Sequence, residues 1–337
     1  MEPLMCPSPT PFAAPVVDRL SIRIVVDSRY ERFLPKATHP VVAIEHVGSI
    51  PGRQMMTLAG EWGLSLHLES EKAGAKSQYL LDFGYTPEII NRNIALLDID
   101  PAKLNGLILS HGHRDHYGGL EGFVTQHRAH MRDDVSLFVG AEDVFREKWL
   151  REGPEGSLVS WGALDRVALT AQKIAPVCCG TAQLLDGPFT SGYIERNSFE
   201  SVTGGTLIAS EDHFTAAERR GEFTKDLHPE EHATCYIVQG RGLVVISSCG
   251  HAGIINSVKT AMAVAKTDKL HAVIGGFHLT ASKPDYIAHT IDEIERLKPD
   301  VVVPMHCTGA NFIAAMRERM PERLVASNLG SRFTFGV

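Results

Sequence analysis

The 337-residue sequence contains no apolar run long enough to cross a bilayer, so a transmembrane helix is not expected. Residues 1–19 carry prolines but no basic stretch ahead of an apolar one, which predicts a flexible N-terminal tail and not a signal peptide. The sequence also lacks the Gly-Lys-Ser/Thr of a phosphate-binding loop and the Gly-x-Ser-x-Gly of a serine nucleophile elbow. Nucleotide hydrolysis by a P-loop and serine-based acyl transfer are therefore not indicated.

The sequence also has no excess of basic over acidic residues. The chain has 33 Lys and Arg against 40 Asp and Glu, a net charge of −7, and the basic residues are dispersed. This balance argues against nucleic acid as a partner and favours a small-molecule substrate. Six cysteines without a Cys-x-x-Cys pair indicate free thiols in a reducing compartment, and the cytoplasm is the expected location. No membrane partner is expected, and whether the chain forms a homodimer stays open.

Hydropathy patterns predict an α/β protein with two β-rich halves. Predicted strands cover residues 20–27, 63–69, 78–83, 106–109, 136–139, 234–239, 242–247, 271–274 and 301–304, and predicted helices cover 86–97, 254–266, 284–297 and 311–320. Thr86 is the expected cap of the first helix. Residues 141–225 show weak patterning and are interpreted as an irregular insertion over the active site. We predict one domain over residues 20–337 with the sheets inside and the helices outside, a four-layer αββα sandwich.

The densest group of chemically active side chains follows the predicted strand 106–109. Residues 110–116 read Ser-His-Gly-His-Arg-Asp-His, so that His111, His113, Asp115 and His116 lie within six positions. Imidazole and carboxylate ligands at this spacing can hold two divalent ions, zinc by preference and iron or manganese as alternatives. The competing interpretation is a solvated turn rich in histidine. Because burying so many polar groups without partners is costly, the metal site is favoured.

This segment, with Asp82-Phe83-Gly84 upstream, resembles the metallo-β-lactamase superfamily, whose signature is His-x-His-x-Asp-His after a short strand. The resemblance implies the four-layer fold of that superfamily for about residues 20–337. Three later blocks are similar to a narrower branch, the dihydropterin ribofuranosylaminobenzene 5′-phosphate synthase-like hydrolases. These blocks are Cys-Gly-His-Ala-Gly-Ile (249–254), Gly-Gly-Phe-His-Leu (275–279) and His-Cys-Thr-Gly (306–309).

The resemblance assigns roles to individual residues. The implied metal ligands are His111, His113, Asp115, His116, His251 and His306. His278 is placed either as a ligand or as a substrate contact. Cys249 occupies the neighbourhood of a bridging aspartate in the wider superfamily, where it serves either as a thiolate ligand or as a small buried hydrophobe. His228 or Glu231 can complete the first metal site, unless residues 228–232 form an exposed charged turn.

The resemblance also implies a reaction. Two divalent ions would activate a water for attack on a small ester, lactone or phosphorylated substrate. Asp115 would orient the nucleophile, His306 or His278 would protonate the leaving group, and Asp82 would orient a ligand histidine. The branch name adds a related transferase as a possibility. Alternatives on the same fold are a di-iron oxygen-reducing enzyme and a phosphodiesterase or ribonuclease.

Overall fold

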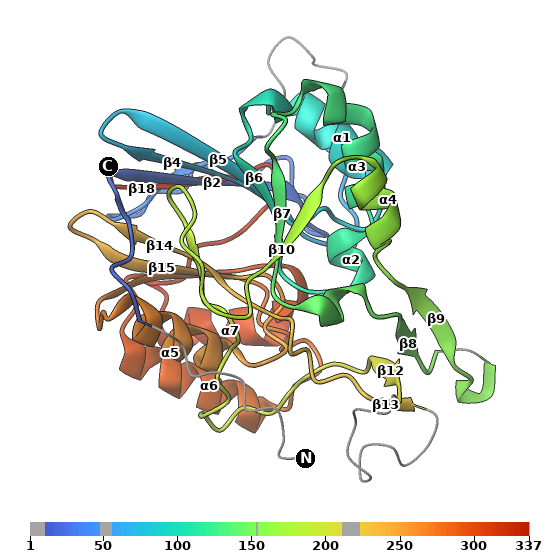
Figure 1. The fold of residues 1–337 in the computed structure, drawn as a ribbon. Coiled ribbons are helices and arrows are strands. Elements are labelled where there is room, and N and C mark those ends of the chain that lie inside the picture. Colours follow the sequence, from blue (N-terminus) through green and yellow to red (C-terminus); the bar gives the residue numbers. More distant parts are fainter. Residues whose placement is uncertain (1–10, 48–55, 153, 211–222, 337) are drawn as a thin grey trace.

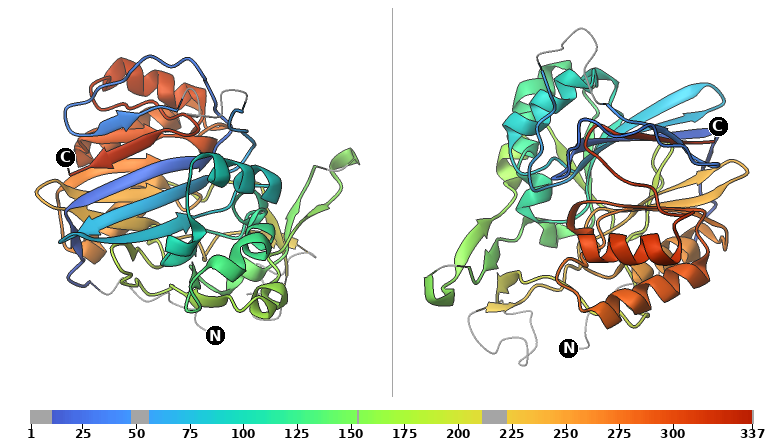
Figure 2. Two further views of the ribbon diagram at one scale, coloured as in Figure 1. Left: turned by 90° about the horizontal axis from the view of Figure 1, so that it is seen from above. Right: turned by 180° about the vertical axis from the view of Figure 1, so that it is seen from behind.

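The computed structural model describes residues 11–47, 56–152, 154–210 and 223–336. Two large β-sheets face each other, and helices cover the outer face of each sheet (Figure 1). The view from behind in Figure 2 shows the same arrangement of sheets and helices. No helix within the described ranges combines the length and apolar character that a membrane-spanning helix needs.

The first sheet has eight strands and contains both the early strands and the last strand of the chain. In spatial order they are β10 (Ala175–Cys178), β7 (Ser136–Val139), β6 (Gly106–Leu109), β5 (Ala75–Leu81), β4 (Ser65–Lys72), β2 (Arg19–Val26), β18 (Arg332–Phe335) and β3 (Ala43–Glu45). Strands β5, β6, β7 and β10 run parallel, whereas β4, β2, β18 and β3 pair antiparallel. Strand β18, near the C-terminus, thus lies between β2 and β3 from the N-terminal part of the chain.

The second sheet has six strands, most of them from the C-terminal half. Its order is β1 (Val16–Val17), β14 (Thr234–Val238), β15 (Gly242–Ser247), β16 (Leu270–Gly275) and β17 (Val301–Pro304), with β11 (Phe189–Thr190) also pairing with β14. Strands β15, β16 and β17 are parallel to one another. Their carboxyl ends therefore lie at one edge of the sheet.

Helices cover the outer faces of the two sheets. On the first sheet lie α1 (Pro87–Leu96), α3 (Leu120–His127) and α4 (Arg166–Ala171); on the second lie α5 (Ile254–Ala265), α6 (Pro284–Leu297) and α7 (Ala310–Arg319) (Figure 1). A further short helix, α2 (Arg114–Tyr117), and 3₁₀ turns at Pro101–Lys103, Arg128–His130, Glu142–Phe145, Pro154–Gly156 and His306–Thr308 complete the helical elements of the described residues. The predicted αββα arrangement is confirmed.

Strand alternation explains why four layers form. In β15, Val244 and Ile246 belong to the apolar cluster between the sheets, whereas Leu243 and Val245 belong to the cluster beneath α5 and α6. A third cluster joins the first sheet to α1 and α3, for example through Phe123. Because successive side chains of a strand point to opposite faces, a strand that is apolar throughout needs a covering layer on both sides.

The segment 141–225 is more ordered than the sequence indicated. Strands β8 (Lys148–Leu150), β9 (Val159–Gly162), β12 (Leu207–Ala209) and β13 (Phe223–Lys225) form a small four-stranded sheet that projects from the two large ones (Figure 1). Strands β10 and β11 from the same segment pair within the main sheets instead. The prediction of one continuous irregular insertion is therefore wrong, because β10 and β11 pair with strands of the main sheets and β8 pairs with β12 across the segment.

Most other predicted elements lie within about three residues of the expected bounds, and two further expectations are corrected. Val16 and Val17, inside the expected tail, pair with β14, while residues 1–10 of that tail lie outside the described residues. Thr86 precedes α1, but its side chain makes no cap hydrogen bond. Its hydroxyl donates instead to Glu61 Oε2 at 2.8 Å. The Glu61 carboxylate also accepts the Thr86 backbone N–H.

Candidate metal centre

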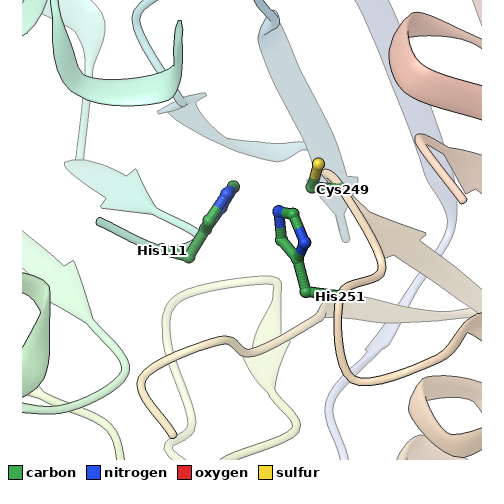
Figure 3. A group of neighbouring side chains, drawn as sticks. All are labelled: His111, Cys249 and His251. Atoms are coloured by element: carbon green, nitrogen blue, oxygen red, sulfur yellow. The ribbon is translucent and has the colours of Figure 1, made fainter. Parts of the chain in front are cut away.

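The carboxyl ends of strands from both sheets meet at one edge of the sandwich. His111, His113 and Asp115 follow β6 of the first sheet. In the second sheet, Cys249 and His251 follow β15, His278 follows β16 and His306 follows β17. Figure 3 shows His111 facing Cys249 and His251 across the space between the two sheets. Carboxyl ends of parallel strands are a frequent place for ligand sites, because the loops there converge.

The imidazole rings at this edge are close together and almost fully buried. The ring of His251 lies 4.9 Å from that of His111, 4.6 Å from that of His113 and 4.2 Å from that of His228, measured between centroids. The ring of His111 lies 4.3 Å from that of His116. The alternative of a solvated histidine-rich turn does not hold, since the exposed fractions of His111, His113 and His116 do not exceed 3%.

Asp115 and His306 lie on the other side of this cluster. Helix α2 carries Asp115 and His116, and Asp115 Oδ2 lies 3.4 Å from His306 Nε2 and 3.7 Å from His116 Nε2. These residues come from different sheets, so only the packing of the sheets brings them together. The six residues predicted as metal ligands therefore share one buried region.

Hydrogen bonds determine which nitrogen three of the histidines present to the centre. His116 Nδ1 donates to Asp82 Oδ2 at 2.7 Å, and His251 Nδ1 donates to the Thr203 carbonyl at 3.0 Å. The single hydroxyl proton of Ser110 goes to Asp82, so His111 Nδ1, 2.9 Å from that hydroxyl, acts as the donor. Each ring then carries its free lone pair on Nε2.

Those lone pairs have no hydrogen-bond partner within the described residues. The unpartnered buried atoms include Nε2 of His111, His116 and His251, Asp115 Oδ1 and both ring nitrogens of His306. Orphaned buried acceptors are costly, each by about 1–3 kcal/mol. A divalent ion among them removes this cost, and nitrogen, oxygen and sulfur donors together suit zinc or iron. The donor set fits a metal centre.

The protonation states of His111, His251 and His228 agree with this. Burial, followed by repulsion from neighbouring imidazoles, lowers the pKa of His111 and of His251 well below the usual histidine value. Burial likewise lowers the pKa of His228 to about 3. These rings are therefore neutral near pH 7, which is the form that binds metal ions.

Asp82 has the position expected of a residue that orients a ligand. Its carboxylate accepts the Ser110 backbone N–H at 2.8 Å in addition to the Ser110 hydroxyl and His116 Nδ1. Its backbone has a φ of +58°, and His228, His278 and His306 at the same edge also have positive φ. Such strained backbone angles in non-glycine residues often occur at functional sites.

Replacing Asp82 with alanine is expected to weaken zinc binding by about 10–100-fold, since His116 and Ser110 lose the carboxylate that orients them. Competition against a chromophoric chelator measures this change. Asp100→Ala is the matched control, because Asp100 also accepts a backbone N–H, from Ala102, but is exposed and contacts none of the candidate ligands in the hydrogen bonds and ion pairs of the described residues. Equal zinc affinity in the Asp82 variant and the wild type would contradict the orienting role.

His228 and Glu231, the two residues expected to complete the first metal site, occupy different places. His228 groups with His113 and His251, with candidate ligand atoms within 4.8 Å of one another. Glu231 instead accepts the backbone N–H groups of His251 at 2.9 Å and of Ala252 at 2.6 Å, so its carboxylate holds the turn that carries His251. The expectation of an exposed charged turn is wrong: His228 and Glu231 are 1% and 3% exposed, because one packs among the histidine rings and the other against the turn that carries His251.

A buried ion cluster, which the sequence did not reveal, supports this region. Lys148 Nζ on β8 lies 2.7 Å from Asp226 Oδ2 and 2.9 Å from Glu230 Oε1, and all three side chains are essentially inaccessible. Burial disfavours the ammonium, but Glu230 and Asp226 outweigh it and raise the pKa of Lys148. Asp226 also accepts the His228 backbone N–H at 2.9 Å. The cluster thus links the small sheet to the loop that carries His228.

Replacing Lys148 with methionine is expected to lower the free energy of unfolding by about 3–5 kcal/mol, because two buried carboxylates lose their cation. Urea denaturation measures the change. Lys76→Met is the control: Lys76 Nζ lies 3.1 Å from Glu69 Oε1 but is 55% exposed, so a loss below about 1 kcal/mol is expected. Similar losses in the free energy of unfolding in the two variants would show that the buried ion cluster stabilises the fold no more than an exposed ion pair.

A cleft of about 400 Å³ opens onto the centre. Its lining includes His113, Asp115, Cys249, His251, His278, His306 and Cys307, together with Trp62, Leu150, Glu152, Trp161 and residues 204–206. The ring of Trp62, 51% exposed, lies 5.1 Å from that of His306, and the ring of Trp161 lies 4.8 Å from that of His113. Two indoles thus flank the row of candidate ligands, and the segment 141–225 supplies one wall.

Comparison with known proteins agrees with the fold. Residues 73–132, which include the His-x-His-x-Asp-His segment, match the family described as the metallo-β-lactamase superfamily. The chain is 29% identical over 282 residues to the 7,8-dihydropterin-6-methyl-4-(β-D-ribofuranosyl)-aminobenzene-5′-phosphate synthase of Methanocaldococcus jannaschii, covering 78% of this chain and 90% of that protein. It is 22% identical over 256 residues to an uncharacterised protein of the same organism, covering 71% and 82% of the two chains.

Among solved structures, a metal-dependent hydrolase of the β-lactamase superfamily superimposes with a TM-score of 0.66 at 21% identity. The superposition covers 93% of this chain and 98% of the other. At this identity the likeness concerns the fold, and it extends over nearly the whole length of both proteins.

Proposed function

This chain is a protein of the metallo-β-lactamase fold, and we propose that it is a metal-dependent hydrolase acting on a small ester, lactone or phosphorylated substrate. The observation that carries the proposal is the set of buried Nε2 atoms of His111, His116 and His251, which have no hydrogen-bond partner within the described residues. Candidate ligand atoms of His111 and His251 lie close together, His116 Nε2 lies 3.7 Å from Asp115 Oδ2, and both His251 and Asp115 line an open cleft.

The donors divide into two groups that suit two ions. His111, His113, His228 and His251 form one group, and Asp115, His116 and His306 form the other. When bound, two divalent ions at such a site lower the pKa of a water and stabilise negative charge that develops on the substrate. A zinc pair is the first expectation because imidazole dominates the donor set.

The remaining steps belong to side chains of the cleft. Asp115 Oδ1 is free of hydrogen bonds among the described residues and can accept a proton from the attacking water or orient it. His278 lines the cleft and is half-buried, whereas both ring nitrogens of His306 are enclosed. We therefore assign protonation of the leaving group to His278 and a ligand role to His306.

A second candidate function is group transfer of the kind named for the relative from Methanocaldococcus jannaschii. That name describes a synthase whose product contains a pterin and an aminobenzene ring. The two indoles of Trp62 and Trp161 favour this candidate, since aromatic walls suit flat rings. Product formation from a dihydropterin and a ribosyl-aminobenzene phosphate, in place of hydrolysis, would distinguish it from the first.

Elemental analysis followed by an activity panel tests the proposal. About two equivalents of zinc or iron per chain are expected, with turnover of at least one class among phosphodiesters, lactones and thioesters. The proposal fails if no metal copurifies and none rebinds while the protein remains folded by circular dichroism. Metal without turnover on the panel, but with synthase activity, would select the second candidate.

A further inference from the structure

Cys249 lies at the junction of the two groups of candidate ligands. Its Sγ clusters with ligand atoms of His111 and His251 on one side, and with those of His116 and His306 on the other, within 4.8 Å in each set. These two sets have no other residue in common. One sulfur atom is therefore within reach of both predicted metal positions.

Contacts with Cys307 and His278 hold the Cys249 sulfur in place. Cys249 Sγ lies 3.2 Å from Cys307 Sγ and 3.3 Å from His278 Nδ1. Cys307 Sγ also lies 3.4 Å from the Cys249 carbonyl oxygen. The two thiols come from the ends of β15 and β17, which the intervening β16 separates within the sheet, so the loops curve toward each other over the sheet edge.

The surroundings of Cys249 are not those of an apolar filler. A cysteine that only fills space packs against hydrocarbon side chains. Cys249 instead contacts an imidazole and a second thiol and lines the cleft, although it is 2% exposed. Its polar neighbours favour a role as a donor.

The charge balance of the centre favours a further anionic donor. Glu231 is occupied by two backbone N–H groups, and Asp82 by Ser110 and His116. Asp226 and Glu230 pair with Lys148, which leaves Asp115, beside His116 and His306, as a carboxylate with an oxygen free of hydrogen bonds within the described residues. Two buried divalent ions balanced by one carboxylate leave a large uncompensated charge, which is costly in a buried site.

We propose that the thiolate of Cys249 is the ligand shared by the two metal ions, and that Cys307 and His278 are positioning residues for it. The inference rests on the proposed function, because it requires a two-metal centre. On binding, the Cys249 thiol releases its proton to solvent and its sulfur forms a bond to each ion. A sulfur donor at the shared position favours zinc, cobalt and cadmium over magnesium and manganese.

Cobalt substitution of the full-length protein tests this. The metal-stripped, reduced chain is titrated with Co²⁺, and the absorption spectrum is recorded. Visible bands report cobalt held by nitrogen and oxygen donors, whereas an intense near-ultraviolet band reports charge transfer from thiolate to cobalt. Both are expected in the wild type. In Cys249→Ser the near-ultraviolet band should be lost while visible bands remain.

Two further variants make the assignment specific. Cys307→Ser should keep most of the near-ultraviolet band, since Cys307 positions the sulfur but is not itself a ligand. Cys178→Ser, which removes an exposed thiol on β10, should leave the spectrum unchanged. The complete absence of cobalt bands in the wild type would contradict the two-metal function itself.

Three results would overturn the thiolate proposal alone. Visible bands without a charge-transfer band in the wild type would show that no thiolate binds. Loss of that band in Cys307→Ser but not in Cys249→Ser would make Cys307 the ligand. A Cys249–Cys307 disulfide in the metal-loaded protein, found by peptide mass spectrometry, would show that the pair serves as a thiol couple.

Discussion

Replacing His251 with alanine is expected to remove bound metal and to lower kcat/KM by about three orders of magnitude, because metal binding supplies several kcal/mol of transition-state stabilisation. His251 belongs to two of the candidate ligand sets, with His111 and Cys249 in one and with His113 and His228 in the other. Its Nδ1 is engaged by the Thr203 carbonyl, so its Nε2 is the atom that faces the centre. Elemental analysis and steady-state kinetics measure the two effects.

His130→Ala is the control for this prediction, since His130 is an exposed histidine in the 3₁₀ turn after α3. Metal content and kcat/KM of this variant should equal those of the wild type. A His251 variant that keeps its full metal content would remove His251 from the ligand set. A His251 variant that keeps its metal but loses turnover would indicate a catalytic role for His251 instead.

Removing the metal with a chelator is expected to lower the Tm by roughly 5–10 °C. The stabilisation lost is about 4 kcal/mol when the free ion had exceeded its Kd by a thousandfold. The structural reason is that unpartnered donors such as His111 Nε2, His116 Nε2 and Asp115 Oδ1 stay buried when no ion neutralises them. Differential scanning calorimetry of the stripped and zinc-reloaded protein measures the shift.

The His251→Ala variant separates a metal effect from an effect of the chelator. It should melt at nearly the same temperature with and without chelator, whereas His130→Ala should show the full wild-type shift. An equal shift in both variants would mean that the chelator acts elsewhere on the chain. No shift in the wild type would mean that its folded state gains nothing from metal.

Several parts of the fold could be predicted from the sequence alone because their signals are local. Residues 284–297 and 301–304 form the predicted helix and strand with the predicted bounds. Strands such as 243–246 are apolar at every position, which requires cover on both faces and hence four layers. The density of donors at residues 111–116 indicates a metal site in the same way, since so many buried polar groups need partners.

Other features depend on contacts between distant segments. Strand β18 completes the first sheet beside β2 because the register of backbone hydrogen bonds joins residues 332–335 to 20–23, and no periodicity encodes that pairing. Lys148 lies in a segment of weak patterning, and only the packing of β8 against residues 226–230 buries its charge. Glu231 and His228 are three positions apart, yet one holds a turn and the other joins the histidine cluster.

The histidine cluster also depends partly on the local sequence and partly on the tertiary structure. The sequence by itself determined the fold class and the kinds of donor at each strand end, since alternation and residue type are properties of neighbouring positions. Only the tertiary structure decided which donors face each other, which nitrogen each ring presents, and that Cys249 and Cys307 approach within 3.2 Å. The physical reason is that these distances depend on how two sheets pack face to face, and that packing is set by the whole apolar core between them.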